Sequence, residues 1–507
     1  MAQGGAAVPA GALGRARLVV EFAALAVLTL AAYTALWLTQ NALWTNGLVA
    51  GMTAQTPRPG SDPVVGLDAT VRVIVLGAAV TGLAVWLFVR AERFAAAGLT
   101  WALITLPLVI AVALYFLPPT LSIDAYSYLS HGFLAATPGL NPYVDASSSV
   151  AWLPYGQLLL DSGWQAVHPV TPYGPLWTMF EKGAYLLSGN NVGLGILLIK
   201  LPSFLAMLGT AALIWRLLAR IAPDRRLRGV LLFLANPLIL IELAGEGHND
   251  AVMIFFVVLA MFATVRRWAF VAVVAIALAV LVKASAAPLG LLVLVALVLW
   301  RRSARRLALE LVAGVVVSAG AAVALFAPFW VGPATLNGLF TEAAAPPGLS
   351  IAGIVYGILR PGTAEIVLLA LLVLPTVAAC FLVRTVTGFI RACSIVSLLI
   401  FVLLPLEWPW YAALPSALLA LGAAEIETVV IVLLALGSRV VAPFGDASAI
   451  GSVYYTIFYT AQAFLGQAVP GLVGLFATVA RVIRERGWRA DASAEAAREL
   501  APARSGN

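Results

Sequence analysis

The stretch GLTWALITLPLVIAVALYFLPPTLSIDAYSYLSHG, residues 98–132, places an acid directly after an apolar run. Its first part, 98–117, carries no charged residue and reaches the ~20 residues that a membrane-spanning helix needs. Asp124, two tyrosines and His131 follow within a few positions. The stretch therefore predicts a spanning helix that ends in a polar segment with chemically versatile side chains.

The same apolar pattern recurs along the chain, which is 62% hydrophobic and only 10% charged. A soluble domain usually carries about 25% charged residues. No alternation of strand length is visible, and backbone groups in lipid are then satisfied only within helices. We therefore predict an all-α polytopic membrane protein with about 13–14 transmembrane helices and one large loop of short interfacial helices at 118–190. The other apolar runs are 18–38, 71–89, 192–215, 229–243, 268–282, 307–327 and 364–383.

Arginine clusters separate these runs at regular intervals, and the positive-inside rule places such clusters in the cytoplasm. The N- and C-termini are then cytoplasmic, and 118–190 lies on the outer face. The predicted division is a cytoplasmic tail at 1–17, one transmembrane domain at 18–486 and a disordered cytoplasmic tail at 487–507. This distribution also explains the net charge of +7 without a nucleic-acid partner. The two cysteines, Cys380 and Cys393, suggest neither a disulfide framework nor a metal site.

The outer segment 118–190 is rich in proline, glycine and aromatic residues, which predicts short helices joined by turns. One such helix over 123–136 would put Asp124, Tyr128 and His131 on one face. We expect its tryptophans to lie near the lipid headgroups, as interfacial tryptophans do; they are Trp152, Trp164 and Trp177.

A second polar cluster is ELAGEGHNDAV, residues 242–252, between two short apolar runs. Placing an acid at bilayer depth costs about 2.5–3.5 kcal/mol, so three acids here need an aqueous cavity or partners. An ordinary polar hairpin turned by two glycines is the simpler interpretation. A functional one is favoured about two to one, because ionisable residues at the membrane edge are functional by default. Glu246 and Asp250 are also candidate ligands for a divalent metal, a cofactor that the sequence leaves undecided.

Two further outer segments carry candidate residues. Lys283, in LVKASAAPLG, is either a snorkelling lysine or a compact cation for a phosphate. Glu407 and Trp410, in LPLEWPWYAALP, belong either to an aromatic belt or to a site where aromatic rings stack on a sugar.

Several function classes are disfavoured by the motifs that the sequence lacks. No phosphate-loop, dinucleotide-binding, nucleophile-elbow or H-E-x-x-H motif occurs, so nucleotide-driven chemistry is disfavoured. A secondary transporter or lipid flippase is the alternative from another class. It predicts polar residues near the midplane and repeated halves, whereas these clusters stay on one face and do not repeat.

The order SIDAYSYLSHG, GLNPY, YGPLW, NPLILIELAGEGHNDAVM, KASAAPL and EWPWY resembles a known family over about residues 120–415. That family is the actinobacterial polyprenyl-phosphomannose-dependent α-(1→6)-mannosyltransferases of lipomannan synthesis. They belong to the GT-C superfamily of multispanning glycosyltransferases. The GHNDA and YGPL elements are the most specific part of the resemblance.

The resemblance implies a plasma-membrane enzyme that transfers mannose, with inversion, from polyprenyl-phosphate-mannose to a lipid-linked mannan acceptor. It implies that Asp124 is the general base on the acceptor hydroxyl. Arabinose or glucose donors remain open. For the donor phosphate we expect Lys283, His248 and His131. For the sugars and the acceptor we expect Tyr126, Tyr128, Tyr173, Asn249, Asp250, Glu246, Glu407 and Trp410.

Overall fold

The computed structural model describes most of the chain: residues 12–43, 63–164, 170–301, 303–340, 350–404, 408–422, 425–441 and 464–499. Within these ranges every regular element is a helix, and no strand occurs. The predicted all-α fold class is therefore confirmed.

The helices of the first half of the chain begin with two long ones and end just before residues 246–249. In chain order they are α1 (Ala12–Leu43), α3 (Pro63–Ala96), α4 (Thr100–Phe116), α5 (Asp124–Ala136), η2 (Ser147–Trp152), α6 (Pro154–Asp161), α7 (Pro175–Ser188), α8 (Val192–Ile221), η3 (Pro223–Arg225), α9 (Arg226–Leu234), α10 (Pro237–Ile239) and η4 (Leu240–Gly245). The last of these, η4, is a π-helical turn.

The second half continues in the same way. Its helices are α11 (Asp250–Arg266), α12 (Ala269–Val282), η5 (Ala284–Ala286), α13 (Ala287–Leu299), α14 (Ala304–Phe326), η6 (Ala327–Phe329), η7 (Pro333–Phe340), α15 (Ile351–Ile358), α16 (Pro361–Ala379), η8 (Cys380–Leu382), α17 (Val386–Leu403), η9 (Pro409–Ala412), α18 (Ala413–Ala420), α19 (Glu425–Val441), η11 (Phe464–Ala468) and α21 (Val469–Glu499). Helix α21 continues past residue 486, where we expected the polar tail to begin.

Membrane-spanning character follows from helix length and composition. Among the described residues, seven helices are long and apolar enough to cross a bilayer, or up to eight if the bent pair Pro223–Leu234 and Pro237–Gly245 forms one span. Three shorter apolar helices, Thr100–Phe116, Ala269–Val282 and Ala284–Leu299, accompany them. The protein is thus a polytopic membrane protein, while the expected number of 13–14 spans stays a prediction.

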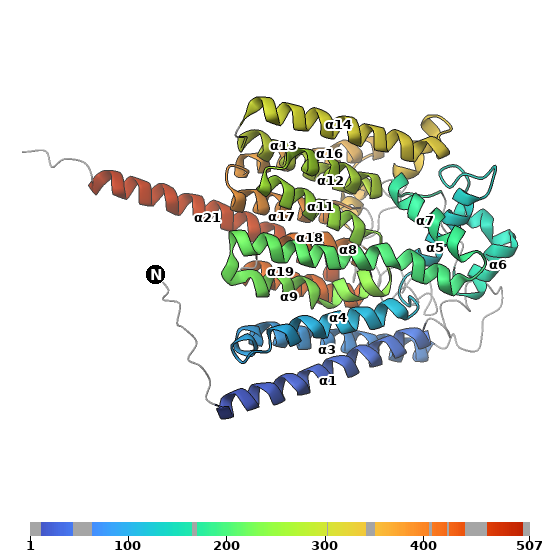
Figure 1. Ribbon diagram of the computed structural model, residues 1–507, viewed down its shortest axis with the longest axis horizontal. Helices are drawn as coiled ribbons and strands as arrows, with labels where there is room; N and C mark the ends of the chain where they lie inside the picture. Colours follow the sequence, from blue (N-terminus) through green and yellow to red (C-terminus); the bar gives the residue numbers. More distant parts are fainter. Residues whose placement is uncertain are drawn as a thin grey trace, which may run out of the picture.

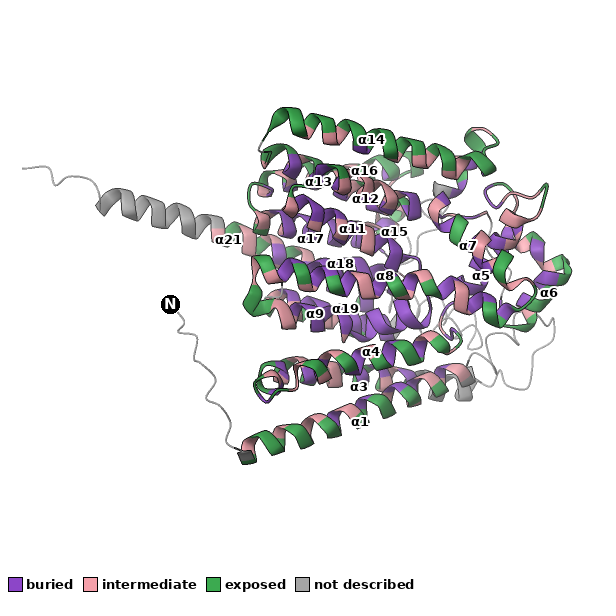
Figure 2. Ribbon diagram, in the orientation of Figure 1, coloured by how far each residue is buried: buried purple, intermediate pink, exposed green. Residues whose placement is uncertain are grey.

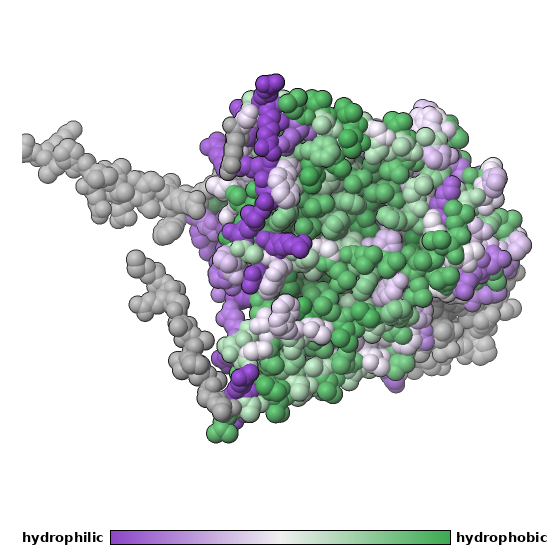
Figure 3. Space-filling view, in the orientation of Figure 1, coloured by the Kyte–Doolittle hydropathy of each residue, from purple (hydrophilic) through white to green (hydrophobic). Residues whose placement is uncertain are grey.

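The long helices lie side by side in one bundle, and shorter helices gather at one of its ends (Figure 1). We call the end that carries α5, α6 and α7 the loop end. The opposite end, where Arg220, Arg266 and Arg301 lie, is the arginine end. Figure 2 shows that burial concentrates in the middle helices, α8, α11 and α18, whereas α14 is largely exposed. In Figure 3 a broad hydrophobic surface separates hydrophilic residues at the two ends, as a bilayer-embedded body requires.

The predicted helix at 123–136 is α5, which packs on α7 within the loop end. That three tryptophans lie at headgroup level stays a prediction, and their exposure differs. Trp152 is 89% exposed, but Trp164 and Trp177 are completely buried. Trp164 donates a hydrogen bond from Nε1 to Ser127 Oγ at 3.1 Å. A buried indole usually has such a partner, and the loop end supplies it for Trp164.

Candidate active site

Asp124 is the first residue of α5, directly after the linker 117–123 that follows α4. Its backbone N–H donates to Ser122 Oγ at 3.1 Å. An acid in the first turn is favoured because the helix N-terminus carries a partial positive charge. The side chain is nevertheless only 9% exposed, so it is held inside the protein at the loop end.

Three side chains from three segments converge on one oxygen of Asp124. The hydroxyls of Tyr128 and Tyr173 each donate to Oδ2 at 3.4 Å. Nδ1 of His248 lies 3.4 Å from the same oxygen. Donors and a cation beside a carboxylate favour its ionised form. The predicted pairing of Asp124 with Tyr128 one helical turn away is therefore present.

A line of alternating charges continues from Asp124 into the bundle. Nε2 of His248 lies 3.2 Å from Glu242 Oε2, and Glu242 Oε1 accepts from the guanidinium of Arg439. The His248, Glu242 and Arg439 side chains are each no more than 1% exposed. Buried charges are tolerated when each has an opposite partner. We name this set, Arg439–Glu242–His248–Asp124, the buried charge line.

His248 lies at the centre of the buried charge line, and its ring is protonated at neutral pH. Burial works against the charged ring, but the adjacent Asp124 and Glu242 outweigh it and raise the pKa of His248 to about 9. The two carboxylates face the two nitrogens of the ring, so each contact favours the protonated imidazole. The ring also stacks on Trp410, with centroids 3.9 Å apart and 17° between the planes.

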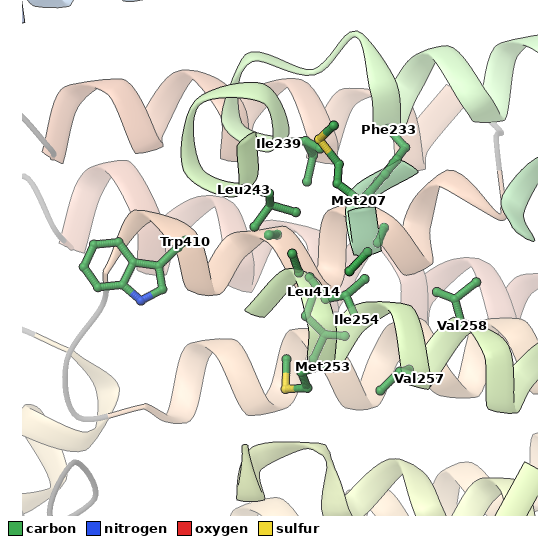
Figure 4. Close-up of a cluster of buried hydrophobic side chains, with 14 of the residues drawn as sticks. Met207, Phe233, Ile239, Leu243, Met253, Ile254, Val257, Val258, Trp410 and Leu414 are labelled. Atoms are coloured by element: carbon green, nitrogen blue, oxygen red, sulfur yellow. The ribbon is translucent and has the colours of Figure 1, made fainter. Parts of the chain in front are cut away.

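Trp410 lies between the buried charge line and the apolar core. Figure 4 shows its indole at the edge of a buried cluster that includes Leu243, Met253 and Leu414. Trp408 also stacks on it, at 5.3 Å with 3° between the rings. Trp410 thus fixes one face of the His248 ring.

Glu246 and Lys200 hold the linker that carries Asp124. The Glu246 carboxylate accepts hydrogen bonds from the backbone N–H groups of Thr120, Leu121 and Ser122 at 3.0–3.1 Å. Lys200 Nζ donates to the carbonyls of Leu114 and Leu117, at 3.0 and 2.7 Å. Charge-assisted hydrogen bonds are stronger than neutral ones. Glu246 is therefore committed to the backbone, and its oxygens position Asp124.

Lys283 follows α12 and reaches across to the start of α11. Its Nζ lies 3.2 Å from Asp250 Oδ2 and 4.3 Å above the centre of the Tyr411 ring. The Tyr173 ring lies 6.0 Å from the same nitrogen. Lys283 is 8% exposed. Lys283 therefore lies beside two aromatic rings, and one of them, Tyr173, also contacts Asp124.

Two predicted sugar-binding residues are buried near these charges. Asn249 is completely buried, and neither its side-chain nitrogen nor its oxygen has a hydrogen-bond partner among the described residues. Buried polar groups are nearly always paired, so this amide is an unusual feature. Tyr126 is 4% exposed; burial, aided by the negative charge of Glu246, raises the pKa of its hydroxyl.

His131 contacts another acid instead of Asp124. Nδ1 of His131 lies 3.3 Å from Glu181 Oε1, and both side chains are buried. Burial raises the pKa of Glu181, against the opposing effect of His131. The His131 ring meets Tyr173 edge-on at 6.2 Å, which is its link to the site. Glu407 lies outside the described residues.

Sequence reasoning missed three charged side chains of this region: Glu181, Lys200 and Arg439. Each lies in a helix that the sequence presents as mainly apolar, and Lys200 and Arg439 are well separated from the other charges of their helices. An isolated charge at that depth is itself a functional signal, and it could have identified Lys200 and Arg439. Their partners, however, lie 83 or more positions away in the sequence.

The sequence left open whether Glu246 and Asp250 bind a divalent metal. Their oxygens already accept from backbone N–H groups and from Lys283, respectively. Within the described ranges, no three His, Cys, Asp or Glu side chains are grouped so that they could hold a metal ion. The donor set therefore does not fit a divalent cation.

Comparison with known proteins gives a consistent picture. Residues 18–302, more than half of the chain, match the family described as alpha-(1→6)-mannopyranosyltransferase, N-terminal domain. Alpha-(1→6)-mannopyranosyltransferase A of Corynebacterium glutamicum is 29% identical over 176 residues, which are 35% of this chain and 35% of that protein. The protein of the same name from Mycobacterium tuberculosis is 33% identical over 177 residues, 33% of this chain and 31% of that protein. The matches thus span about a third of these relatives.

Proposed function

Because this chain belongs to the alpha-(1→6)-mannopyranosyltransferase family, we propose that it transfers mannose from polyprenyl-phosphate-mannose to a mannoside acceptor at the loop end. The acceptor we propose is a lipid-linked mannan, extended by α-(1→6) linkages with inversion. The loop end would face the outer side of the plasma membrane, with both termini in the cytoplasm. The arginine clusters at the opposite end support this orientation.

The observation that carries the proposal is the convergence of Tyr128, Tyr173 and His248 on buried Asp124. A general base must be ionised and positioned within reach of the proton it takes. The two phenols and the imidazolium favour ionisation, and the linker held by Glu246 fixes the position. Asp124 would accept the proton of the acceptor hydroxyl while the oxygen of that hydroxyl bonds to the anomeric carbon of mannose.

The bond between the anomeric carbon and the phosphate oxygen breaks in the same step. The leaving group is polyprenyl phosphate, which gains one negative charge while Asp124 gains the proton. Cations at a developing charge lower the barrier, because the site is already arranged around them. Lys283 is our candidate for this role, and protonated His248 supplies a second positive charge nearby.

Unpaired and aromatic groups near the buried charge line support sugar recognition. The buried Asn249 amide offers donors and an acceptor without partners among the described residues, which suits sugar hydroxyls. Tyr126 would supply flat apolar surface for a ring face, whereas Trp410 already stacks with His248 and Trp408 and would act by holding the His248 ring. We infer that Asp250 orients Lys283, since its carboxylate already pairs with that cation.

The test is transfer from labelled polyprenyl-phosphate-mannose to an α-mannoside by purified protein in lipid, with the product linkage read by NMR. We expect Asp124→Asn to abolish product formation. The matched control is Asp161→Asn, the same change at an exposed acid of α6, which should retain wild-type transfer. Equal product from wild type and Asp124→Asn would refute the assignment of the base.

The same assay examines the alternatives for the donor and the class. Polyprenyl-phosphate-arabinose and polyprenyl-phosphate-glucose are tested in parallel, and faster turnover with either would replace mannose in the proposal. Movement of labelled lipid across vesicle membranes, with no sugar transfer, would favour the flippase instead.

A further inference from the structure

A pocket lined by arginines lies at the arginine end, opposite the end that carries Asp124. Its volume is about 510 Å³. Four segments meet there: the end of α8, the α11–α12 turn, the end of α13 and the start of α14. Five arginines line it, Arg220, Arg266, Arg267, Arg301 and Arg306, and we call it the arginine pocket.

The arginine pocket has a large excess of positive charge. Glu310 is its one acid, and the Glu310 carboxylate is already engaged by Arg306 Nε at 2.7 Å and by the backbone N–H of Ala269 at 2.9 Å. Four positive charges therefore remain over a shared concave surface. Guanidinium groups match the oxygens of a phosphate, which they bind with paired hydrogen bonds.

Membrane orientation alone does not account for this arrangement. Orientation needs positive charges near the ends of spans but no cavity between them. Here Arg266 stacks over Trp268, 4.7 Å from the ring centre. Arg267 adopts φ +61°, the one positive φ of a non-glycine residue in the described chain. Glycine is the usual residue in that conformation, so an arginine at this position carries a steric cost.

The arginine pocket opens beside a surface that faces lipid. Only 6% of the most apolar stretch of the helical segment Ala304–Phe329, which contains α14, is buried within the protein. Leu309 and Val312, on either side of Glu310 in α14, are 64% and 63% exposed. Figure 3 shows hydrophilic residues at this end directly beside the hydrophobic surface of the bundle. A ligand here would meet cations at one end and apolar side chains at the other.

We propose that the arginine pocket binds the phosphate of an anionic glycerophospholipid from the adjacent leaflet, with the acyl chains along α14. Basic pockets between transmembrane helices are suited to such headgroups. This inference is independent of the transferase reaction and of Asp124.

Native mass spectrometry of the full chain in detergent tests the proposal. The probes are phosphatidylglycerol and, as the neutral counterpart, phosphatidylcholine. The pocket variant combines Arg220→Gln, Arg267→Gln and Arg301→Gln. The control variant removes the same charge at exposed arginines outside the pocket, with Arg216→Gln, Arg305→Gln and Arg384→Gln. Both are checked for folding by size-exclusion chromatography and thermal unfolding.

We expect wild type and the control variant to retain phosphatidylglycerol in preference to phosphatidylcholine. The pocket variant should bind it about tenfold more weakly, as expected when charge-assisted bonds to phosphate are lost. If the triple variant does not fold, Arg267→Gly serves instead, because glycine relieves the positive φ while removing one guanidinium. Equal retention by the pocket and control variants would overturn the site. Full displacement by excess inorganic phosphate, with equal thermal stabilisation by phosphate alone, would overturn the lipid assignment.

Discussion

Replacing His248 with glutamine should remove a pH-dependent part of the protein's stability. The ring lies between Asp124 and Glu242, at 3.4 and 3.2 Å, with no exposure to solvent. Glutamine retains polar atoms of similar reach but carries no proton to lose. The variant therefore separates the charge of His248 from the space that it fills.

The size of the effect follows from the pKa. A rise from the ordinary value of 6.5 to about 9 corresponds to roughly 3 kcal/mol in favour of the folded protein when the ring is protonated. Because the folded pKa is the higher one, this stability is fully present below about pH 6.5. It is lost as the pH rises through about 9. With ~2 cal/mol/K of unfolding entropy per residue over 507 residues, the change is about 3 °C in Tm.

The assay is thermal unfolding in one detergent at a series of pH values from neutral to alkaline. Wild type should lose about 3 °C relative to His248→Gln across this range, because groups other than His248 titrate equally in both proteins. His131→Gln is the matched control, since it removes the other buried histidine and leaves the buried charge line intact. Parallel pH curves for wild type and His248→Gln would refute the reasoning.

Three further changes examine the remaining supports of the site. Glu246→Gln should lower kcat about 100-fold with little change in KM, since a catalytic group displaced by about 1 Å loses that much; an unchanged kcat in steady-state transfer assays would exclude a positioning role. Lys283→Met combined with Asp250→Asn, which leaves no unpaired buried charge, should raise KM for the polyprenyl-phosphate donor at least tenfold if Lys283 binds the phosphate; the same KM as wild type would remove it from the donor site. Gly174→Ala should destabilise the protein by more than 2 kcal/mol, because its Cβ would overlap the carbonyl at the end of α12; Gly183→Ala, whose Cβ would meet nothing within 4 Å, is the control in the same thermal unfolding measurement, and equal Tm values would contradict the overlap.

Sequence patterns predicted the helical membrane class because they are local. Each long apolar run, such as 192–215 or 307–327, coincides with a helix, since lipid leaves the backbone no other solution. Helical spacing likewise predicted the contact between Asp124 and Tyr128. The same spacing put His131 on that face, and the contact of its ring with Glu181 comes from another helix, α7. Spacing orders side chains on one helix but does not say which helix packs against that face.

The composition of the polar hairpin indicated a charged site but not the tasks of its acids. Glu242 and Glu246 are four positions apart in one cluster, yet one pairs with His248 and Arg439 and the other binds the backbone at 120–122. The role of Glu242 depends on α19, which follows it in the sequence. The role of Glu246 depends on the α4–α5 linker, which precedes it. Such long-range choices arise from packing of the whole bundle, and one sequence does not reveal them.

The π-helical turn η4, Leu240–Gly245, makes the number of residues part of this chemistry. Such turns hold one residue more per turn than an α-helix and often occur at functional sites. Removing one residue there would restore ordinary helical pitch and rotate the preceding helix by about 100° relative to the hairpin. Glu242 would then no longer face both Arg439 and His248. Evolution can exchange side chains around this site more readily than it can shorten or lengthen the segment that carries them.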